Sequence, residues 1–588
     1  IESGTAGDYN IKSAHFEYLQ NKATLAPRIR PMPAVIDPPL EFHEQFRLFA
    51  SDGEQILAGM PYRITSASGK VWKGATDSQG FTERVYTAEP EELSLVYDME
   101  EEEEEEDLAG ITLRLGLFFD GTGNNQANSA ATAQCRREDL ALYDQGELES
   151  ILNQCKQYGF DQFDGKGFDS TPNDSYGNAP SNVVHLYDFY PDHATDGLPP
   201  ETETGFIKVY LEGIGTRSSG SDSRYGQATG QGETGVVARV EQAPAVMELQ
   251  LRNFTVTNPE TSIRHIEFDI FGFSRGAAAA RHCANELLKP GLGLFGELLQ
   301  GGRFGLLDSF DPARDVSLNL IGLFDTVAGI ADIARGDFSV SDDYNPGVNL
   351  YLPPGCARQV IQLQARDERR HNFSLNSVLD GHRQISLPGV HSDIGGGYLP
   401  RARERVWLTP PRRFSVPVNS RADSQLAWAE ARVEMLALHA SGLAGDDGTF
   451  AINAWPIQPA ASGRPEPEDV AHLLTIELDR KVRGELALIA LRVMRELGVR
   501  HGVPFKSLEG RSDLALPADL QPIAEEILDQ VLAGIEVSLT PRQERLLRSR
   551  YIHQSAHWVP NRGFLVNKPT DNNVRYVHPN RPQKGYPE

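Results

Sequence analysis

Gly272-Phe273-Ser274-Arg275-Gly276 stands between an apolar stretch over residues 264–271 and the small-residue run Ala277-Ala278-Ala279-Ala280. The apolar stretch predicts a buried strand, and the alanines predict the start of a helix. A strand, a sharp turn and a helix form the setting of a serine nucleophile, because the turn exposes the hydroxyl and the flanking glycines let backbone pass closely. The pentapeptide alone is common, but these flanks predict that Ser274 is a catalytic nucleophile.

A serine nucleophile of this kind needs an acid and a histidine later in the chain, each at the end of a strand. Asp325 ends the apolar run over residues 318–324, so it is the expected acid. Asp393 is a rival acid, although its closeness to the expected histidine suggests that it shapes the loop. A simple helix N-cap is the plain structural alternative for Asp325.

His391 is the expected base. It lies in the glycine-rich loop over residues 388–398, directly after a run that ends at Leu387. A histidine on such a loop can reach a serine at the same edge of the sheet. His553 and His557, near the end of the chain, are rival bases.

Backbone N–H groups are expected to hold the negative charge that develops on the substrate oxygen. The N–H of Arg275, at the start of the predicted helix, supplies one donor. The loop over residues 120–125 closes the first strand of the same region and is rich in glycine. Gly121 or Thr122 is therefore the expected second donor.

Short apolar runs separated by longer segments indicate an α/β fold with a parallel sheet between helices. These runs cover residues 111–119, 206–211, 266–272, 318–324 and 383–387. They place an α/β domain at residues 111–400, with a polar loop excursion over 126–181.

Four further regions flank this domain. We expect an extended arm over residues 1–42, a small sandwich-like β module over 43–97 and an acidic linker over 98–110. Residues 401–588 are predicted to be helical, with helices over 425–443, 470–497, 520–535 and 543–550 and an irregular tail.

Two segments of the chain combine features that suit a lipid interface. The first is apolar and glycine-rich and contains Leu294 and Phe295. The second mixes cations with aromatic groups and contains Arg403, Arg405 and Trp407. Ordinary packing and a solvated basic strip are the alternatives.

Composition excludes several classes of protein. The 588 residues include 82 acidic and 56 basic ones, and the net charge of -26 argues against a nucleic-acid-binding protein. No apolar stretch approaches a membrane span, and no secretory signal is visible. None of the four cysteines forms a Cys-x-x-Cys pair, and we expect Cys135 and Cys155 to be free thiols rather than a pair.

Several of these motifs occur together in one order. They are residues 117–125, 212–216, 272–278, 322–327, 367–370 and 388–398. In this order they resemble the α/β-hydrolase domain family that includes bacterial phospholipase effectors. More narrowly, the chain is similar to the Gly-x-Ser-x-Gly lipase effectors of the type VI secretion system, over roughly residues 111–400.

The resemblance implies an α/β-hydrolase fold with Ser274, Asp325 and His391 as a catalytic triad and with no metal or organic cofactor. It implies hydrolysis of phospholipid acyl esters (phospholipase A1 or A2 activity) in the periplasm or membrane of a rival bacterium, after synthesis in the producer's cytoplasm and type VI secretion. A type VI spike protein, docked by the N-terminal module, and an immunity protein are the implied partners. A soluble carboxylesterase or acyltransferase, and a secretion adaptor with a degenerate hydrolase domain, are the alternatives.

Overall fold

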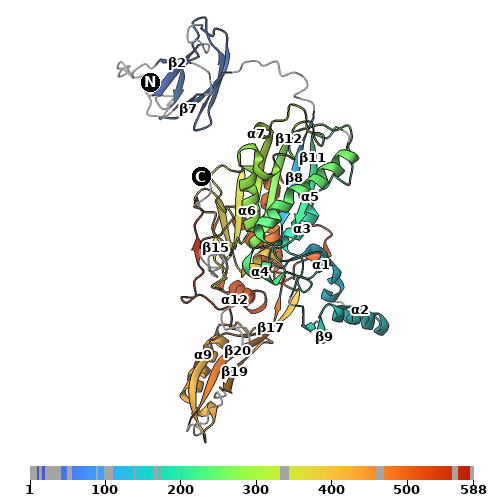
Figure 1. Cartoon of the computed structure of the whole chain (residues 1–588). Helices are drawn as coiled ribbons and strands as arrows, with labels where there is room; N and C mark the ends of the chain where they lie inside the picture. The colour runs from blue at the N-terminus through green and yellow to red at the C-terminus, as the bar shows by residue number, and fades with distance from the viewer. Residues whose placement is uncertain are drawn as a thin grey trace, which may run out of the picture. The chain divides into compact units, whose positions relative to one another are not determined.

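The structure of the protein is a computed structural model, and it describes residues 9–11, 16–19, 42–49, 56–87, 90–97, 110–137, 140–163, 168–172, 174–199, 201–330, 343–457, 469–558 and 567–582. The chain divides into two compact units, Ile1–Ala109 and Gly110–Glu588, and each is described by itself (Figure 1). Most of the predicted arm and nearly all of the predicted acidic linker lie outside the described residues.

The N-terminal unit contains two small sheets. One has the strand order β1-β7-β4-β5, and the other has the order β2-β3-β6. Buried side chains from both sheets, including Phe46, Ile64 and Leu95, form one apolar cluster. Both described segments of the predicted arm are strands of these sheets, which local sequence could not indicate because their partners are distant. The strands are β1 (Tyr9–Ile11), β2 (Phe16–Leu19), β3 (Phe42–Leu48), β4 (Pro61–Ser66), β5 (Val71–Ala75), β6 (Val85–Thr87) and β7 (Leu93–Tyr97).

A six-stranded parallel sheet forms the centre of the second unit, in the order β11-β8-β12-β13-β14-β16. The strands are β8 (Ile111–Phe119), β11 (Thr204–Leu211), β12 (Ile263–Phe273), β13 (Val316–Phe324), β14 (Gln359–Ala365) and β16 (Arg383–Leu387). The predicted α/β architecture is confirmed. The sequence analysis missed β14, because Gln362 and Gln364 interrupt its apolar run.

Helices cover both faces of this sheet. The first face carries α5 (Val236–Thr257) and α6 (Arg275–Leu287), whose small and apolar residues join one buried cluster. The second face carries α3 (Asn182–Phe189), α10 (Ala487–Arg500) and α11 (Gln521–Leu532), which join another. The last two helices come from the predicted C-terminal region, so the core of the α/β unit extends well beyond residue 400.

An antiparallel sheet with one helix projects from the end of the unit where β17 and β20 leave it (Figure 1). It contains β17 (Arg401–Trp407), β18 (Arg412–Pro417), β19 (Thr449–Pro456) and β20 (Asp469–Arg483), with α9 (Leu426–Ala440) packed against it. The prediction of one helix over residues 470–497 is wrong in its first half. Leu474, Ile476 and Leu478 are buried at a spacing of two, which is the period of a strand.

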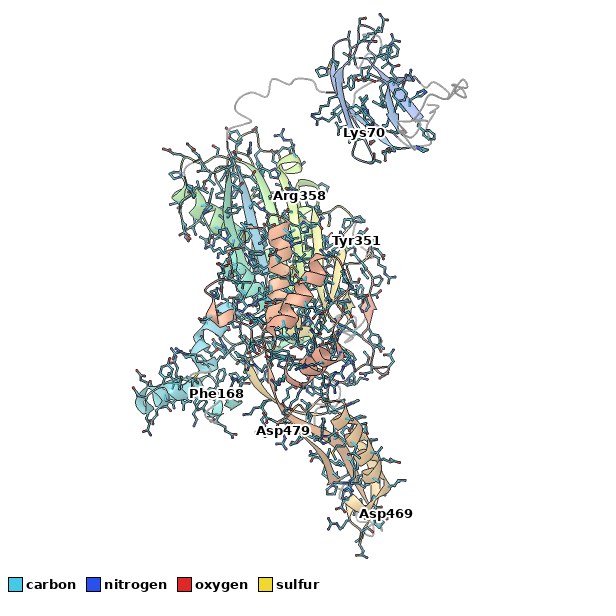
Figure 2. All side chains as sticks on the ribbon, turned by 180° about the vertical axis from the view of Figure 1, so that it is seen from behind. Lys70, Phe168, Tyr351, Arg358, Asp469 and Asp479 are labelled. Carbon is cyan, nitrogen blue, oxygen red and sulfur yellow. A yellow bond between two sulfur atoms is a disulfide. The ribbon has the colours of Figure 1, made fainter. Side chains whose placement is uncertain are left out.

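The polar excursion carries secondary structure of its own: α1 (Gln126–Ala131), α2 (Gln145–Gln157) and the hairpin of β9 (Asp161–Phe163) and β10 (Phe168–Ser170). Figure 2 shows its tip near Phe168. A disulfide joins Cys135 to Cys155, so the expectation of two free thiols is wrong. The two cysteines lie 20 residues apart in the sequence. This spacing alone does not reveal that the chain between them returns and places Cys155, in α2, beside Cys135.

Short elements complete the unit. They are η2 (Ala133–Arg136), η3 (Leu140–Leu142), α4 (Arg224–Thr229), η4 (Pro290–Phe295), α7 (Pro312–Asp315), β15 (Leu375–Asn376), α8 (His391–Gly395), η6 (Ala422–Ser424), η7 (Ser512–Leu514), α12 (Pro541–Arg550) and β21 (Val577–His578).

Candidate active site

Ser274 occupies the turn between β12 and α6. Its backbone has φ 57° and ψ -125°, a conformation that non-glycine residues rarely adopt. The turn is held from the neighbouring strand, because the Ser274 N–H donates to the Phe324 carbonyl at 3.0 Å. A Cβ on Gly276 would overlap the carbonyl oxygens of Phe119 and Asp120, and one on Gly272 would meet the Gly276 carbonyl. Both glycines are therefore required by close backbone approach, and strain of this kind marks a functional turn.

Asp325 and His391 are hydrogen-bonded to each other. Asp325 ends β13, His391 begins α8, and the His391 Nδ1 lies 2.5 Å from the Asp325 Oδ2. Both side chains are buried. The imidazole packs against the ring of Phe273, the residue before Ser274, with the ring centroids 4.7 Å apart. The structure therefore places the three predicted residues after the carboxyl ends of β12, β13 and β16, at one edge of the parallel sheet.

The charge states of this pair suit proton transfer. Burial alone would raise the pKa of Asp325, but Arg575 and His391 outweigh it and lower that pKa to about 2. Burial lowers the pKa of His391, although the hydrogen bond that it donates to Asp325 works in the opposite direction. The pair at neutral pH is thus a carboxylate and a neutral imidazole, which is the state of a general base.

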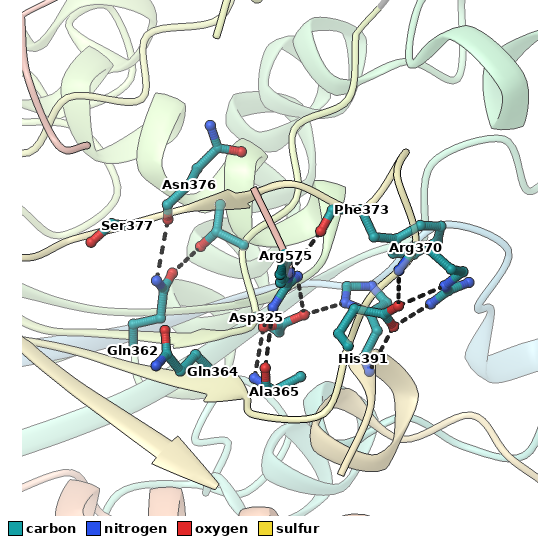
Figure 3. A network of polar contacts seen from close by, with 12 residues as sticks. Asp325, Gln362, Gln364, Ala365, Arg370, Phe373, Asn376, Ser377, His391 and Arg575 are labelled. Carbon is teal, nitrogen blue, oxygen red and sulfur yellow. Dashed lines mark hydrogen bonds and ion pairs between the residues drawn. The ribbon is translucent and has the colours of Figure 1, made fainter. Parts of the chain in front are cut away.

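Arg575 is a site residue that the sequence analysis missed. Its guanidinium makes two hydrogen bonds of 2.7 Å to the two oxygens of Asp325, and its Nε donates to the Phe373 carbonyl (Figure 3). The Ala365 N–H donates to the same carboxylate at 2.8 Å. Arg575 belongs to the C-terminal tail, which is fixed here by the pairing of β21 with β15. No local pattern marked it, because its partner lies far away in the sequence.

Glu368 belongs to the motif over residues 367–370, but no individual role was predicted for it from the sequence. Its buried carboxylate accepts the His391 N–H at 3.2 Å, pairs with Arg370 at 2.8 Å and accepts the Ser555 hydroxyl at 3.1 Å. Burial opposes the charge, but Arg370 outweighs it and keeps the pKa of Glu368 well below its usual range. Glu368 thereby fixes the backbone of the histidine loop.

The rival residues form a different pair. The His553 Nδ1 lies 2.7 Å from Asp393 Oδ1, and the His553 ring stacks on Tyr398. Asp393 also accepts the Val390 N–H at 3.0 Å, which fits the expectation that it shapes the loop. His557 contacts the Gln554 carbonyl instead. None of these rivals contacts the Asp325–His391 pair through a described hydrogen bond.

The two loop candidates for the oxyanion hole differ. The Gly121 N–H donates to the Asp120 carboxylate at 2.7 Å, so it is not available to a substrate oxygen in this structure. The Thr122 N–H donates to no acceptor in the part of the chain that the structure describes. Arg275 is the first residue of α6, where an N–H has no acceptor within the helix. Thr122 and Arg275 are therefore the available donors.

The buried Asp120 carboxylate holds the loop over residues 120–125 through several hydrogen bonds, including the one from the Gly121 N–H. This carboxylate also accepts the hydroxyls of Ser181 at 2.5 Å and Tyr210 at 2.7 Å. Burial, only partly offset by these bonds, raises the pKa of Asp120 to about 6. Ser181 begins α3 and bridges to Gly396 in the histidine loop, so one carboxylate links the two loops of the site.

The proposed lipid-contact residues divide into two groups. Phe295 is fully buried among apolar residues packed on α6, so its prediction as a contact residue is wrong, while Leu294 beside it is 43% exposed. Arg403 and Arg405 pair across the antiparallel sheet with Asp479 and Glu477. Trp407 lies against Trp455. Carboxylates of the same sheet thus neutralise these two arginines, which weakens the prediction that they bind lipid phosphate.

The described residues hold no group of three or more His, Cys, Asp or Glu side chains that could bind a metal ion. None of the helices among them has the length and apolar character needed to cross a membrane.

Comparison with known proteins finds one effector structure that is similar to most of this chain. No protein-family model matches the chain, and no curated protein matches it. Among solved structures, the Tle1 effector bound to the VgrG spike of the type VI secretion system has a TM-score of 0.58 and 27% identity, over 80% of this chain and 94% of that one. An uncharacterized protein from Pseudomonas aeruginosa has a TM-score of 0.33 and 16% identity, over 79% and 56% of the two chains. The first likeness supports a Tle-type effector.

Proposed function

We propose that this protein is a type VI effector that hydrolyses acyl ester bonds of membrane glycerophospholipids, with Ser274 as nucleophile. The observation that carries the proposal is the strained Ser274 turn beside the buried Asp325–His391 pair. The likeness to the Tle1 effector supports a type VI effector, and the lipid substrate is what the sequence resemblance to lipase effectors implies.

The chemistry follows from the geometry. His391, held in one orientation by Asp325, takes the proton from the Ser274 hydroxyl while the serine oxygen attacks the acyl carbonyl. The N–H groups of Arg275 and Thr122 stabilise the negative oxygen of the tetrahedral intermediate. The C–O bond to the lysophospholipid then breaks, and His391 protonates the leaving oxygen. Water, deprotonated by His391, attacks the acyl-serine and releases the fatty acid, which regenerates Ser274.

A direct test uses vesicles of phosphatidylethanolamine and phosphatidylglycerol. The full chain should release lysophospholipid and fatty acid in equal amounts, measured by mass spectrometry. Ser274→Ala should lose about 10⁴-fold or more of this activity. A His557→Gln variant serves as the matched control and should keep its activity. Equal activity of Ser274→Ala and the unaltered chain would exclude the proposal.

A soluble carboxylesterase or acyltransferase is the alternative enzyme. Such an enzyme would hydrolyse a short water-soluble ester faster than phospholipid vesicles. The ratio of activity on the ester to activity on vesicles therefore distinguishes it from a phospholipase. A secretion adaptor with a degenerate domain would show neither activity. The intact Asp325–His391 pair favours an active enzyme over that adaptor.

Delivery and target form the remaining part of the proposal. We propose that the N-terminal unit docks to a type VI spike protein, that an immunity protein protects the producer, and that the effector acts in the target periplasm. The Tle1 effector was solved bound to a VgrG spike, which supports the first of these partners. Expression with a periplasmic export signal should kill a host cell, whereas the Ser274→Ala form should not.

A further inference from the structure

A cavity of about 760 Å³ adjoins the loop over residues 388–398 that carries His391. Its wall includes Gly396 and Gly397, which directly follow α8, the helix that begins with His391. Residues of the excursion, of α3 and of the segment that leads from β20 into α10 line the rest. Figure 1 shows the excursion and the antiparallel sheet leaving the unit at the same end of the parallel sheet.

Arg136 lines this cavity without an acidic partner. Its guanidinium donates to the Thr132 hydroxyl at 2.7 Å and to the carbonyl and hydroxyl of Ser129 at 2.5 and 3.1 Å. All of these acceptors are neutral, and no carboxylate in the described part of the chain pairs with Arg136. Burial lowers the pKa of Arg136 to about 10, so the group is still cationic at pH 7. A largely buried cation without a counter-charge is costly, and an anion in the cavity would satisfy it.

Two buried polar atoms in the same wall also lack partners. The Asn182 amide nitrogen donates to the Ile394 and Ala487 carbonyls, both at 2.8 Å, which fixes the orientation of the amide. The Asn182 Oδ1 is then left without a hydrogen-bond donor. The buried His185 Nδ1 also has no hydrogen-bond partner. Burial lowers the pKa of His185 to about 4, so this ring is neutral. A hydroxyl or ammonium group of a ligand would supply the donor that Asn182 lacks.

The other charges of the wall are mostly basic. Arg137, Arg401 and Arg483 line the cavity together with Glu485 and Asp513. Arg483 pairs with Glu485, and Asp513 pairs with Arg511 outside the wall. Both acids are therefore already paired with arginines.

We infer that this cavity binds the phosphoryl headgroup of the lipid substrate, with Arg136 on the phosphate oxygens and with Asn182 and His185 on the hydroxyl or ammonium group beyond. The inference rests on the proposed function and names the part of the substrate that selects phospholipid over neutral lipid. A guanidinium matches two phosphate oxygens at once, whereas an ammonium does not. The cavity adjoins the histidine loop, so a bound headgroup would lie on the catalytic side of the unit.

The kinetic test compares two soluble short-chain substrates, dihexanoyl phosphatidylethanolamine and dihexanoylglycerol. Arg136→Gln should lower kcat/KM for the phospholipid about tenfold or more, mainly through KM, and should leave the glycerol ester within about twofold. Arg136→Lys keeps the charge but loses the planar guanidinium that can bind two oxygens. Its kcat/KM for the phospholipid should lie between those of the unaltered chain and Arg136→Gln. Lys156→Gln, an exposed cation of the same excursion, is the matched control and should change neither value. Equal losses on both substrates, or no loss on the phospholipid, would overturn the inference.

Binding to the full-length Ser274→Ala variant separates this inference from the proposed hydrolysis. Calorimetry should show glycerophosphoethanolamine binding more tightly than inorganic phosphate, and Arg136→Gln should abolish both signals. This result would stand even if no ester were hydrolysed, in which case only the proposed function would fail. Phosphate binding as tight as that of glycerophosphoethanolamine would contradict a headgroup site and indicate a free phosphate site. Absence of binding by either compound would also overturn the inference.

Discussion

Arg575 and Asp325 are 250 residues apart in the chain and form a two-point ion pair with both N–O distances at 2.7 Å. The candidate catalytic acid is therefore held by the C-terminal tail as well as by its own strand. The same carboxylate accepts the imidazole N–H of His391, so Arg575 and His391 share one anion. Arg575 is a positioning residue that also tunes the charge of the pair.

Replacement of Arg575 should shift the pH profile of the enzyme. The Arg575 charge contributes to the low pKa of His391, so Arg575→Gln should raise that pKa. A general base must be unprotonated, and the acidic limb of kcat/KM should therefore move to higher pH. We also expect an activity loss of about tenfold or more at pH 7.

The controls for this prediction come from the same position and the same tail. Arg575→Lys keeps the charge and should restore much of the acidic limb. Arg581→Gln removes an exposed cation that pairs with Asp343, and it should leave the profile unchanged. An acidic limb that does not move in Arg575→Gln would show that Arg575 only stabilises the fold.

Asp120 should give the protein a distinct dependence of stability on pH. Its pKa is about 6 in the folded state against 3.8 for the free group. The folded state thus holds the proton more tightly, and this stabilisation is complete below pH 3.8 and lost as the pH rises through 6. From pH 4 to 7 the unaltered chain should lose about 2 kcal/mol of unfolding free energy relative to Asp120→Asn. Urea unfolding of both proteins across this range measures the difference, and parallel curves would refute the account.

Gly276→Ala should be severely destabilising, because its Cβ would overlap the backbone of the loop at Phe119 and Asp120. We expect a loss of about 3 kcal/mol in unfolding free energy together with loss of activity. Gly146→Ala in α2 meets nothing closer than 3.5 Å and should be neutral or slightly stabilising. Thermal unfolding of the two variants checks this, and similar melting temperatures would contradict the described packing.

The disulfide should stabilise the excursion. Cys135 and Cys155 lie 20 residues apart and close a loop of about that length. The lower entropy of the cross-linked unfolded chain should stabilise the folded state by about 3 kcal/mol. Cys155→Ser should therefore make residues 126–181 more sensitive to limited proteolysis, whereas Cys356→Ser, a free thiol, should not. Cys135 directly precedes Arg136, so the same variant should also weaken activity on phospholipid. Unchanged protection of this segment would argue against the bond.

Local sequence was sufficient for the centre of the fold. The Gly272–Gly276 turn, its strand and its helix are consecutive, and the apolar runs that lead to Asp325 and His391 are continuous. Strands buried on both faces show such runs, which is why five of the six parallel strands could be located from them, although their order in the sheet could not.

The features that were missed depend on distant contacts. Arg575 and β1 acquire their roles from partners far away in the chain, and neither leaves a local periodicity. The helix predicted over residues 470–497 is a strand in its first half, because β20 (Asp469–Arg483) pairs with β17, β18 and β19, which lie elsewhere in the sequence. The exposed N–H of Gly121 was expected from glycine content, but the neighbouring Asp120 side chain accepts it.

Covalent labelling tests the central claim most directly. The full chain, treated with a fluorophosphonate and digested, should carry one adduct in the peptide that contains Ser274, and labelling should abolish ester hydrolysis in proportion to occupancy. Asp325→Asn and His391→Gln should slow the labelling rate by about 10³-fold or more. An adduct at another serine, such as Ser392 or Ser555, or hydrolysis that persists after complete labelling of Ser274, would contradict the account.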